Sequence, residues 1–109
     1  DLSIGLSAFF GCSSLASITI SSSLNSICGY LFYNCFRLIS VKIQNSVTEI
    51  GNYAFFGCNG LTSITIPKSV NSIGEYAFDE CSSLKTVSIP KDCEYHSNAF
   101  PGGVTINKY

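Results

Sequence analysis

The sequence has little of what catalysis or membrane insertion requires. It contains one histidine, no tryptophan and no methionine, and its uninterrupted apolar runs are only a few residues long. A bilayer-spanning helix needs about 20 consecutive apolar residues, so no transmembrane segment is expected. Charged residues make up 12% of the 109 positions, and the formal net charge is −1. This balance excludes a strongly basic nucleic-acid binder, and the apolar share of 46% excludes a disordered chain.

Catalytic motifs are missing as well. The nucleotide-binding patterns GxGxxG and GxxxxGK do not occur, and neither does the metalloprotease pattern HExxH. The single imidazole, His96, lies close to Glu94 and Ser97 in the sequence. Neighbouring side chains in a turn point apart, whereas a hydrolytic triad must converge on one pocket. We therefore predict a protein that is not an enzyme and that has no cofactor or metal site.

What the sequence does contain is a repeat of 23 residues. Phenylalanine, cysteine and leucine recur at this spacing, in the columns Phe9, Phe32, Phe55, Phe78; Cys12, Cys35, Cys58, Cys81; and Leu15, Leu38, Leu61, Leu84. Two aliphatic columns follow, Ile18, Val41, Ile64, Val87 and Ile20, Ile43, Ile66, Ile89. Units of this length bury their apolar faces only by stacking on one another, which predicts a solenoid.

Each repeat contains a strand signal. Leu61–Ile66 ends in alternating apolar and polar residues that are rich in β-branched types, as in a half-buried strand. Pro67 should end this strand because it has no N–H to donate. Val70–Ile73 predicts a second, weaker extended segment, and the short stretch YAFFGC at 53–58 allows only a turn or a 3₁₀ segment.

The expected fold is an α/β repeat solenoid that is mostly β. It is a short leucine-rich-repeat type of stack, with a parallel β-sheet on one face and turns or 3₁₀ segments elsewhere. Residues 95–100 match the fourth repeat with the register shifted by one residue, and Val104–Ile106 supplies a last strand. We expect one domain over 1–109, with coils at about 4–26, 27–49, 50–72 and 73–94 and a partial repeat or cap at 95–109 that ends the array.

The stretch LTSITIPKSVNSIGEYAFDEC at 61–81 closely resembles the 23-residue unit of the BspA-like leucine-rich repeats. The resemblance covers about residues 4–100, although the first two coils depart from the pattern IPxSVxxIGxxAF. It implies a leucine-rich-repeat scaffold, a cell-surface or secreted location, and adhesion to or recognition of other proteins. It implies no catalytic activity.

Four of the six cysteines share one column of the repeat. Stacking in register would hold their Cα atoms about 4.8 Å apart with parallel Cα–Cβ bonds, which leaves the Cβ atoms too far apart for an ordinary disulfide. We expect buried free thiols at these positions and at Cys93. Cys28 replaces a turn glycine, so it should be the exposed thiol, and its pairing stays open.

Two aromatic columns have different expected roles. The column that ends in Phe100 should form a stacked core ladder. The column of Phe10, Tyr33, Phe56 and Asp79 must be partly exposed because it accepts an aspartate. It either packs against the turns or forms a partner-docking strip.

The outward positions of the strands form the candidate binding face. Its residues are Ser17, Thr19, Ser40, Lys42, Gln44, Ser63, Thr65, Lys68, Lys85, Thr86, Ser88 and Lys91. No acidic residue is expected on or beside it, because Glu49, Glu75, Asp79 and Glu80 belong to the turn side. We expect this mildly cationic face to meet an acidic protein or glycan.

Other interpretations stay open. The same rod could be a structural spacer with no ligand of its own, which the shortage of large aromatics on the strands favours. A regular array of hydroxyls could also bind ice. The first coil has no polar cap, so we expect a possible dimer through this N-terminal coil.

Overall fold

The computed structural model describes residues 16–20, 25–27 and 29–109, and in this part of the chain the regular elements are all strands. The longer strands are β1 (Ser17–Ile20), β3 (Ser40–Ile43), β5 (Ser63–Thr65), β7 (Thr86–Ile89) and β9 (Thr105–Lys108). Two-residue strands alternate with them, at β2 (Ser26–Ile27), β4 (Glu49–Ile50), β6 (Ser72–Ile73) and β8 (Glu94–Tyr95). None of the described residues belongs to a helix that could cross a bilayer.

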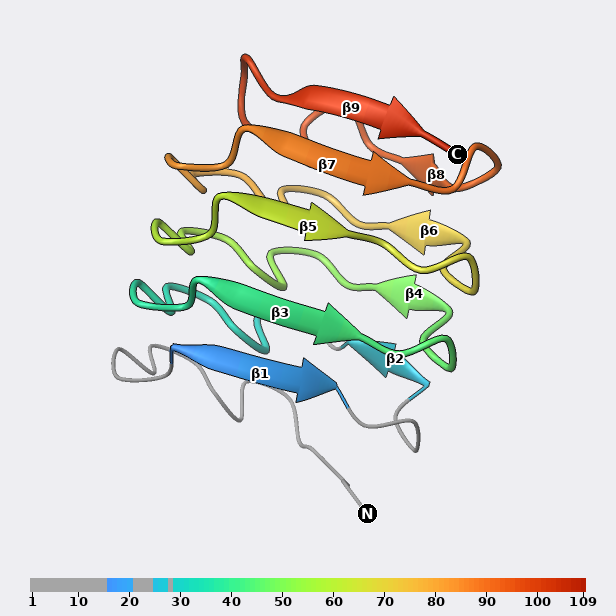
Figure 1. Ribbon diagram of the computed structural model, residues 1–109, viewed down its shortest axis with the longest axis horizontal. Coiled ribbons are helices and arrows are strands. Elements are labelled where there is room, and N and C mark those ends of the chain that lie inside the picture. Colours follow the sequence, from blue (N-terminus) through green and yellow to red (C-terminus); the bar gives the residue numbers. More distant parts are fainter. Residues whose placement is uncertain (1–15, 21–24, 28) are drawn as a thin grey trace.

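The strands stack in parallel, one coil above the next, and this confirms the predicted solenoid (Figure 1). The longer strands follow one another along one side, and the two-residue strands form a second, four-stranded sheet in the order β2-β4-β6-β8. The register advances by 23 residues, as in Ile18 opposite Val41, and by 22 residues between Ser72 and Glu94. The predicted one-residue register shift in the last repeat is therefore confirmed.

The ladder of longer strands is interrupted between β3 and β5, although the two strands remain in contact. At the far end of the stack, the Tyr109 N–H donates to the Ile89 carbonyl at 3.0 Å. By the register of β5, β7 and β9, the residue that corresponds to Tyr109 is Pro67, two positions after β5, and it has no N–H to donate toward β3. The sequence therefore removes one inter-strand hydrogen bond at this level.

The segments between the two sheets are turns. The sequence predicts either turns or 3₁₀ segments there. Alternate N–H groups bond within the coil and between coils. Those of Ala54, Phe56 and Cys58 donate to the carbonyl three residues earlier, whereas those of Tyr53, Phe55 and Gly57 donate to the next coil. This alternation satisfies the backbone of a buried, irregular segment without a helix.

The core is a ladder of phenylalanines, as predicted. Phe32, Phe55 and Phe78 are fully buried, and their stacked rings have centroids 5.1 and 5.0 Å apart. Phe100 continues the ladder at 5.2 Å from Phe78. Each buried ring contributes about 2–3 kcal/mol through removal from water, so the ladder ties neighbouring coils together.

The cysteine column runs beside this ladder. Cys58, Cys81 and Cys93 are buried free thiols, as the sequence predicts, and Cys35 is buried in the same column, whereas Cys12 and Cys28 lie outside the described residues. The Cys58 thiol donates to the Phe32 carbonyl at 3.3 Å, and the Cys81 thiol donates in the same way to the Phe55 carbonyl at 3.1 Å. These thiols are therefore donors between coils as well as apolar filling.

Candidate binding face

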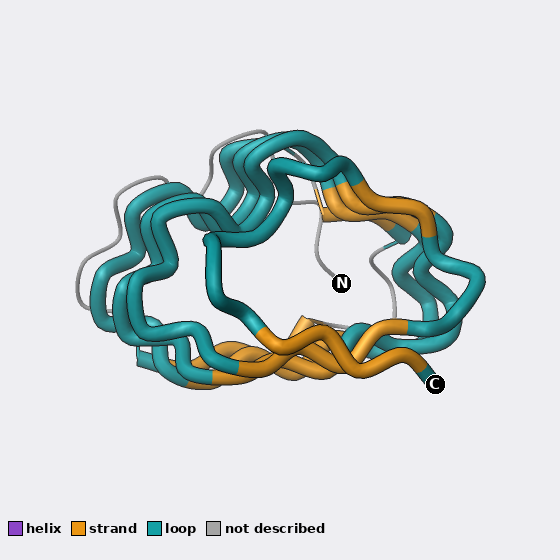
Figure 2. Tube along the Cα trace, turned by 90° about the horizontal axis from the view of Figure 1, so that it is seen from above, coloured by secondary structure: helices purple, strands orange, loops and turns teal. Residues whose placement is uncertain are grey.

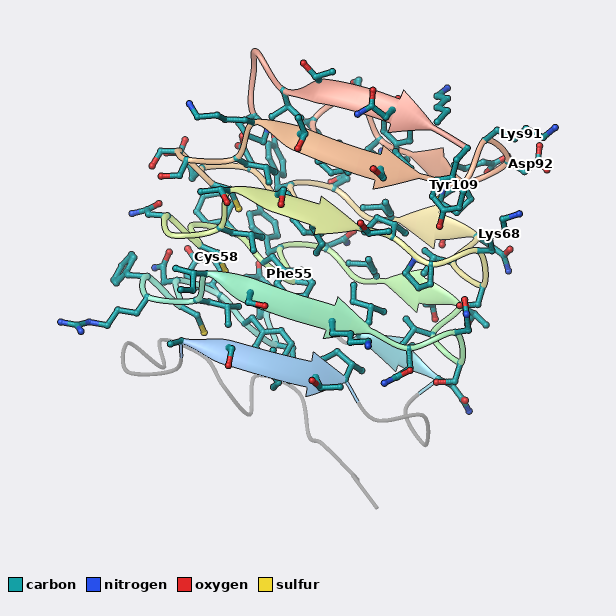
Figure 3. All side chains as sticks on the ribbon, viewed as in Figure 1. Phe55, Cys58, Lys68, Lys91, Asp92 and Tyr109 are labelled. Atoms are coloured by element: carbon teal, nitrogen blue, oxygen red, sulfur yellow. The ribbon has the colours of Figure 1, made fainter. Side chains whose placement is uncertain are left out.

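The candidate binding face lies along the stack of longer strands (Figure 3). Ten of its twelve residues are exposed, and Gln44 and Ser88 are half-buried. Pairing in register places Thr19 beside Lys42 and Ser63 beside Thr86. The structure therefore brings the predicted residues together on one surface. The hydrogen-bonded ladder beneath this surface is interrupted only between β3 and β5 among the described strands.

The lysines of this face are exposed to solvent. Lys42 projects from β3, Lys85 precedes β7, and Lys68 and Lys91 follow β5 and β7. The described residues of β1, β3, β5, β7 and β9 include no acidic side chain. Several cations along strands that carry no carboxylate create a positive potential that attracts acidic groups.

The prediction that no acidic residue lies beside the face is wrong at one position. Asp92 follows Lys91 in the exposed turn after β7, and the two are neighbours at one end of the face (Figure 3). Together with Lys68 and Tyr109 they line a pocket of about 160 Å³. The sequence reasoning missed Asp92 because the turn lies just beyond the strand columns that it compared.

At this end of the face, the Tyr109 side chain takes the place of a missing backbone hydrogen-bond donor. By analogy with the bond between the Tyr109 N–H and the Ile89 carbonyl, residue 90 should donate its N–H to the Ile66 carbonyl. That residue is Pro90, which has no N–H. The Tyr109 hydroxyl donates to the Ile66 carbonyl instead, and the Lys68 Nζ lies 5.9 Å from the centre of its ring.

The pocket beside Tyr109 also has a buried wall formed partly by Cys93. Burial, and to a smaller extent the neighbouring Glu94 carboxylate, raise the pKa of the Cys93 thiol. The thiol is therefore neutral near pH 7 and is a poor nucleophile.

Two apolar side chains extend the binding face beyond the predicted residues. Ile39, just before β3, is 60% exposed, and Phe36 in the preceding turn is 49% exposed. Ile39 also lines a groove of about 420 Å³ between β3 and β5. A sequence signal was available, because the Ile39 column otherwise holds Ala16, Thr62 and Lys85, and the Phe36 column otherwise holds Ser13, Asn59 and Ser82.

Lys108 lies on β9 but does not belong to the binding face. It is paired with Ile89, which points into the core, and its Nζ lies 5.8 Å from the centre of the Tyr95 ring. Its charge is therefore displaced from the outward row that contains Lys42, which makes it a natural control.

The histidine contacts a different partner from the ones beside it in sequence. His96 Nδ1 lies 3.9 Å from Glu75 Oε2 on the preceding coil, and about half of each side chain is exposed. His96 also lines a hollow of about 570 Å³ over the second sheet, together with Glu49 and Glu94. In the described part of the chain, no three His, Cys, Asp or Glu side chains are grouped to hold a metal ion.

The second aromatic column is partly exposed, as predicted. Tyr33, Phe56 and Asp79 are each half-buried, whereas Phe10 lies outside the described residues. The first coil before residue 16 lies outside them too, so the dimer expected there stays a prediction.

Comparison with known proteins agrees with the geometry. The profile of the family described as BspA type leucine rich repeat region (6 copies) matches residues 2–107. No curated protein matches the chain. Among solved structures, a leucine rich cell surface protein from Faecalibacterium prausnitzii A2-165 is similar, with a TM-score of 0.74 and 38% identity over 80% of this chain and 22% of that one.

Two further solved structures are similar. A leucine-rich repeat protein from Bacteroides ovatus ATCC 8483 has a TM-score of 0.60 and 26% identity, over 96% of this chain and 39% of that one. The leucine rich repeat protein of T. pallidum shares the fold, with a TM-score of 0.59 and 23% identity over 94% and 64% of the two chains. The chain thus spans less than two thirds of each of the three. From the match over residues 2–107, it belongs to the BspA-type leucine-rich repeat family.

Proposed function

We propose that this chain is a non-catalytic recognition domain of a cell-surface or secreted protein, and that its face of longer strands binds an acidic protein or glycan. The observation that carries the proposal is the set of exposed lysines on or beside the longer strands, whose described residues include no acidic side chain. One of the similar solved structures is that of a leucine rich cell surface protein, which supports the location.

The apolar side chains at the edge of the face support a protein partner. Interfaces combine a buried apolar centre with charged groups around it. Ile39 and Phe36 have exposed apolar surface, and Lys42, three residues after Ile39 on β3, is positively charged. We infer that an acidic protein surface gains both steering and burial here, whereas a glycan would use the lysines and hydroxyls alone.

The second candidate function is a structural spacer. The described outward positions of the longer strands are serine, threonine, asparagine and lysine, without an aromatic residue. Because hot spots are rich in tyrosine, tryptophan and arginine, such strands alone could form a solvated wall. A spacer would bind nothing through this face, which separates the two functions experimentally.

Binding to an array of extracellular-matrix proteins and acidic glycans, at low and at physiological salt, tests the proposal. Saturable binding that weakens with salt is expected. The double variant Lys42→Glu/Lys85→Glu should abolish it, and Ile39→Thr should weaken binding to a protein more than binding to a glycan. The control is Lys108→Glu, which makes the same change of charge at one site outside the face. It should leave the affinity within about twofold of the wild-type value.

Unchanged affinity of the Lys42→Glu/Lys85→Glu variant would overturn the assignment of the face. Absence of binding to every component of the array, at both salt concentrations, would favour the spacer.

A further inference from the structure

A strip of aromatic side chains covers the turns of successive coils. It consists of Tyr30, Tyr33, Tyr53, Phe56 and Tyr76, which we call the aromatic strip. The rings of Tyr53 and Tyr30 are stacked with centroids 5.0 Å apart, and those of Tyr53 and Tyr76 with centroids 5.2 Å apart. Tyr33 and Phe56 form a second stacked pair at 5.2 Å, and Tyr53 joins the two columns through Phe56 at 5.3 Å. The result is one continuous aromatic surface.

The aromatic strip is accessible to a partner. Tyr30 is 39% exposed, and the other four rings are half-buried. The loops that carry it begin after β2, β4 and β6, on the side of the coil opposite the longer strands, and the residues of the strip lie in the first part of each loop (Figure 2). This surface is therefore separate from the lysine-bearing face.

The backbone beneath the strip is in an unfavourable conformation. Tyr30, Tyr53 and Tyr76 have φ angles of 65°, 62° and 57°, in the left-handed region. Bulky residues avoid this region, whereas glycine and asparagine adopt it at much lower cost. The sequence nevertheless has tyrosine at this turn in three successive coils, although Asn98 takes the same place in the last one. Retention of a costly residue points to a role for its side chain.

The surroundings of the strip are acidic. Asp79 occupies the next position of the column that contains Tyr33 and Phe56, and Glu75 directly precedes Tyr76. Burial, followed by the neighbouring tyrosines Tyr30 and Tyr76 and the Glu75 carboxylate, raises the pKa of Tyr53. The hydroxyls and this carboxylate therefore share one electrostatic environment, in which a cation is favoured.

The hollow over the second sheet extends this acidic surface. Glu49 and Glu94 line it from β4 and β8, with Ser72 between them in register. Asn52, beside Tyr53 in the sequence, lines the same hollow, so the hollow borders the aromatic strip. A ligand that bridges the two would meet ring edges and faces on one side and carboxylates on the other.

We propose that the aromatic strip and the bordering hollow form a second interaction face, which binds an extended, arginine-bearing segment of a partner protein. Arginine fits both halves of the surface, because its planar cation stacks on aromatic rings and pairs with carboxylates. The face is independent of the lysine-bearing strands, and its charge selects the opposite kind of partner.

Fluorescence anisotropy with a labelled eight-residue peptide of alternating arginine and glycine tests this face directly. Because the chain has six tyrosines and no tryptophan, intrinsic tyrosine emission gives a second readout of contact with the strip. Saturable binding and a change in tyrosine emission are expected. A peptide of alternating glutamate and glycine should not bind.

Three variants separate binding from folding. Tyr53→Asn removes the ring and is compatible with the left-handed backbone, which Asn34 also adopts at a φ of 58°, and it should weaken peptide binding at least tenfold. Glu75→Gln/Asp79→Asn removes two negative charges, one exposed and one half-buried, with little change in side-chain size. It should weaken peptide binding about fivefold and reduce the salt dependence of that binding. Tyr53→Phe keeps the ring and should stay within threefold. The urea midpoint of each variant is measured alongside.

Lys42→Glu/Lys85→Glu is the control for the other face, and it should leave peptide binding within twofold. A folded Tyr53→Asn protein with unchanged peptide affinity would overturn the proposal, and so would a wild-type protein that binds neither peptide. If sedimentation shows self-association that Tyr53→Asn abolishes while the peptide fails to bind, the occupant is a second copy and the proposal is also overturned. None of these three results affects the proposal for the lysine-bearing face.

Discussion

Replacement of Phe55 by alanine should destabilise the protein far more than the same replacement of its neighbour Phe56. Phe55 is fully buried between Phe32 and Phe78, with ring centroids 5.1 and 5.0 Å away. Loss of a buried phenylalanine costs about 3–5 kcal/mol, because transfer free energy is lost and a cavity forms. Phe56 is half-buried on the outer surface of the coil, so we expect a cost of about 1–2 kcal/mol there.

Urea unfolding monitored by circular dichroism measures both values. The two variants delete the same atoms from adjacent residues of one turn, so their unfolded chains are closely matched. A domain of this size has a total stability of about 5–15 kcal/mol, and Phe55→Ala could leave little of it. Phe55→Leu, which retains most of the buried volume, then gives a measurable loss. Equal losses for Phe55→Ala and Phe56→Ala would refute the assignment of the ladder as the core.

Three further predictions concern the ties between coils. A hydrogen bond with Cys81, and then burial, raise the pKa of Cys58 above its usual range. The stabilisation from the neutral thiol should therefore be complete below about pH 8.5, and above it the free energy of unfolding should fall by up to about 1.4 kcal/mol per pH unit. Urea unfolding measured at several pH values should show a shallower decline of this free energy for Cys58→Ala. Tyr109→Phe removes the donor to the Ile66 carbonyl and should cost about 0.5–1.5 kcal/mol in the same assay, whereas no change would mean that water replaces the hydroxyl. Gly57→Ala should cost more than about 1 kcal/mol, because φ is +75° there and the new Cβ would lie 2.1 Å from the Asn34 Oδ1; a melting temperature equal to that of the unchanged protein would contradict this.

The fold could be predicted from the sequence because its periodicity is also its geometry. Residues 23 positions apart stack on one another, so a column such as Phe32, Phe55 and Phe78 is both a sequence pattern and a physical ladder. The one-residue register shift was readable for the same reason, since Phe100 follows Phe78 by 22 positions. Periodicity alone did not predict the hydrogen-bonded second sheet of two-residue strands, because such short segments carry almost no alternation.

The candidate faces were only partly predictable. Alternation along a strand identifies outward positions such as Lys42. It does not predict which residues are exposed outside the strands, such as Ile39 and Asp92. The aromatic strip was visible only as the column with Tyr33 and Phe56. The participation of Tyr53 depends on a positive φ angle, which orients its side chain and has no signature in hydrophobic periodicity.

Lysine acetylation footprinting tests the central claim, that the stack of longer strands is the binding face. The purified protein is acetylated alone and when saturated with the tightest component of the binding array, and each lysine is quantified by mass spectrometry. We predict that Lys42 and Lys85 are protected in the complex, while Lys108, whose side chain lies over Tyr95, reacts as in the free protein. Protection of Lys108 without protection of Lys42 and Lys85 would contradict the account.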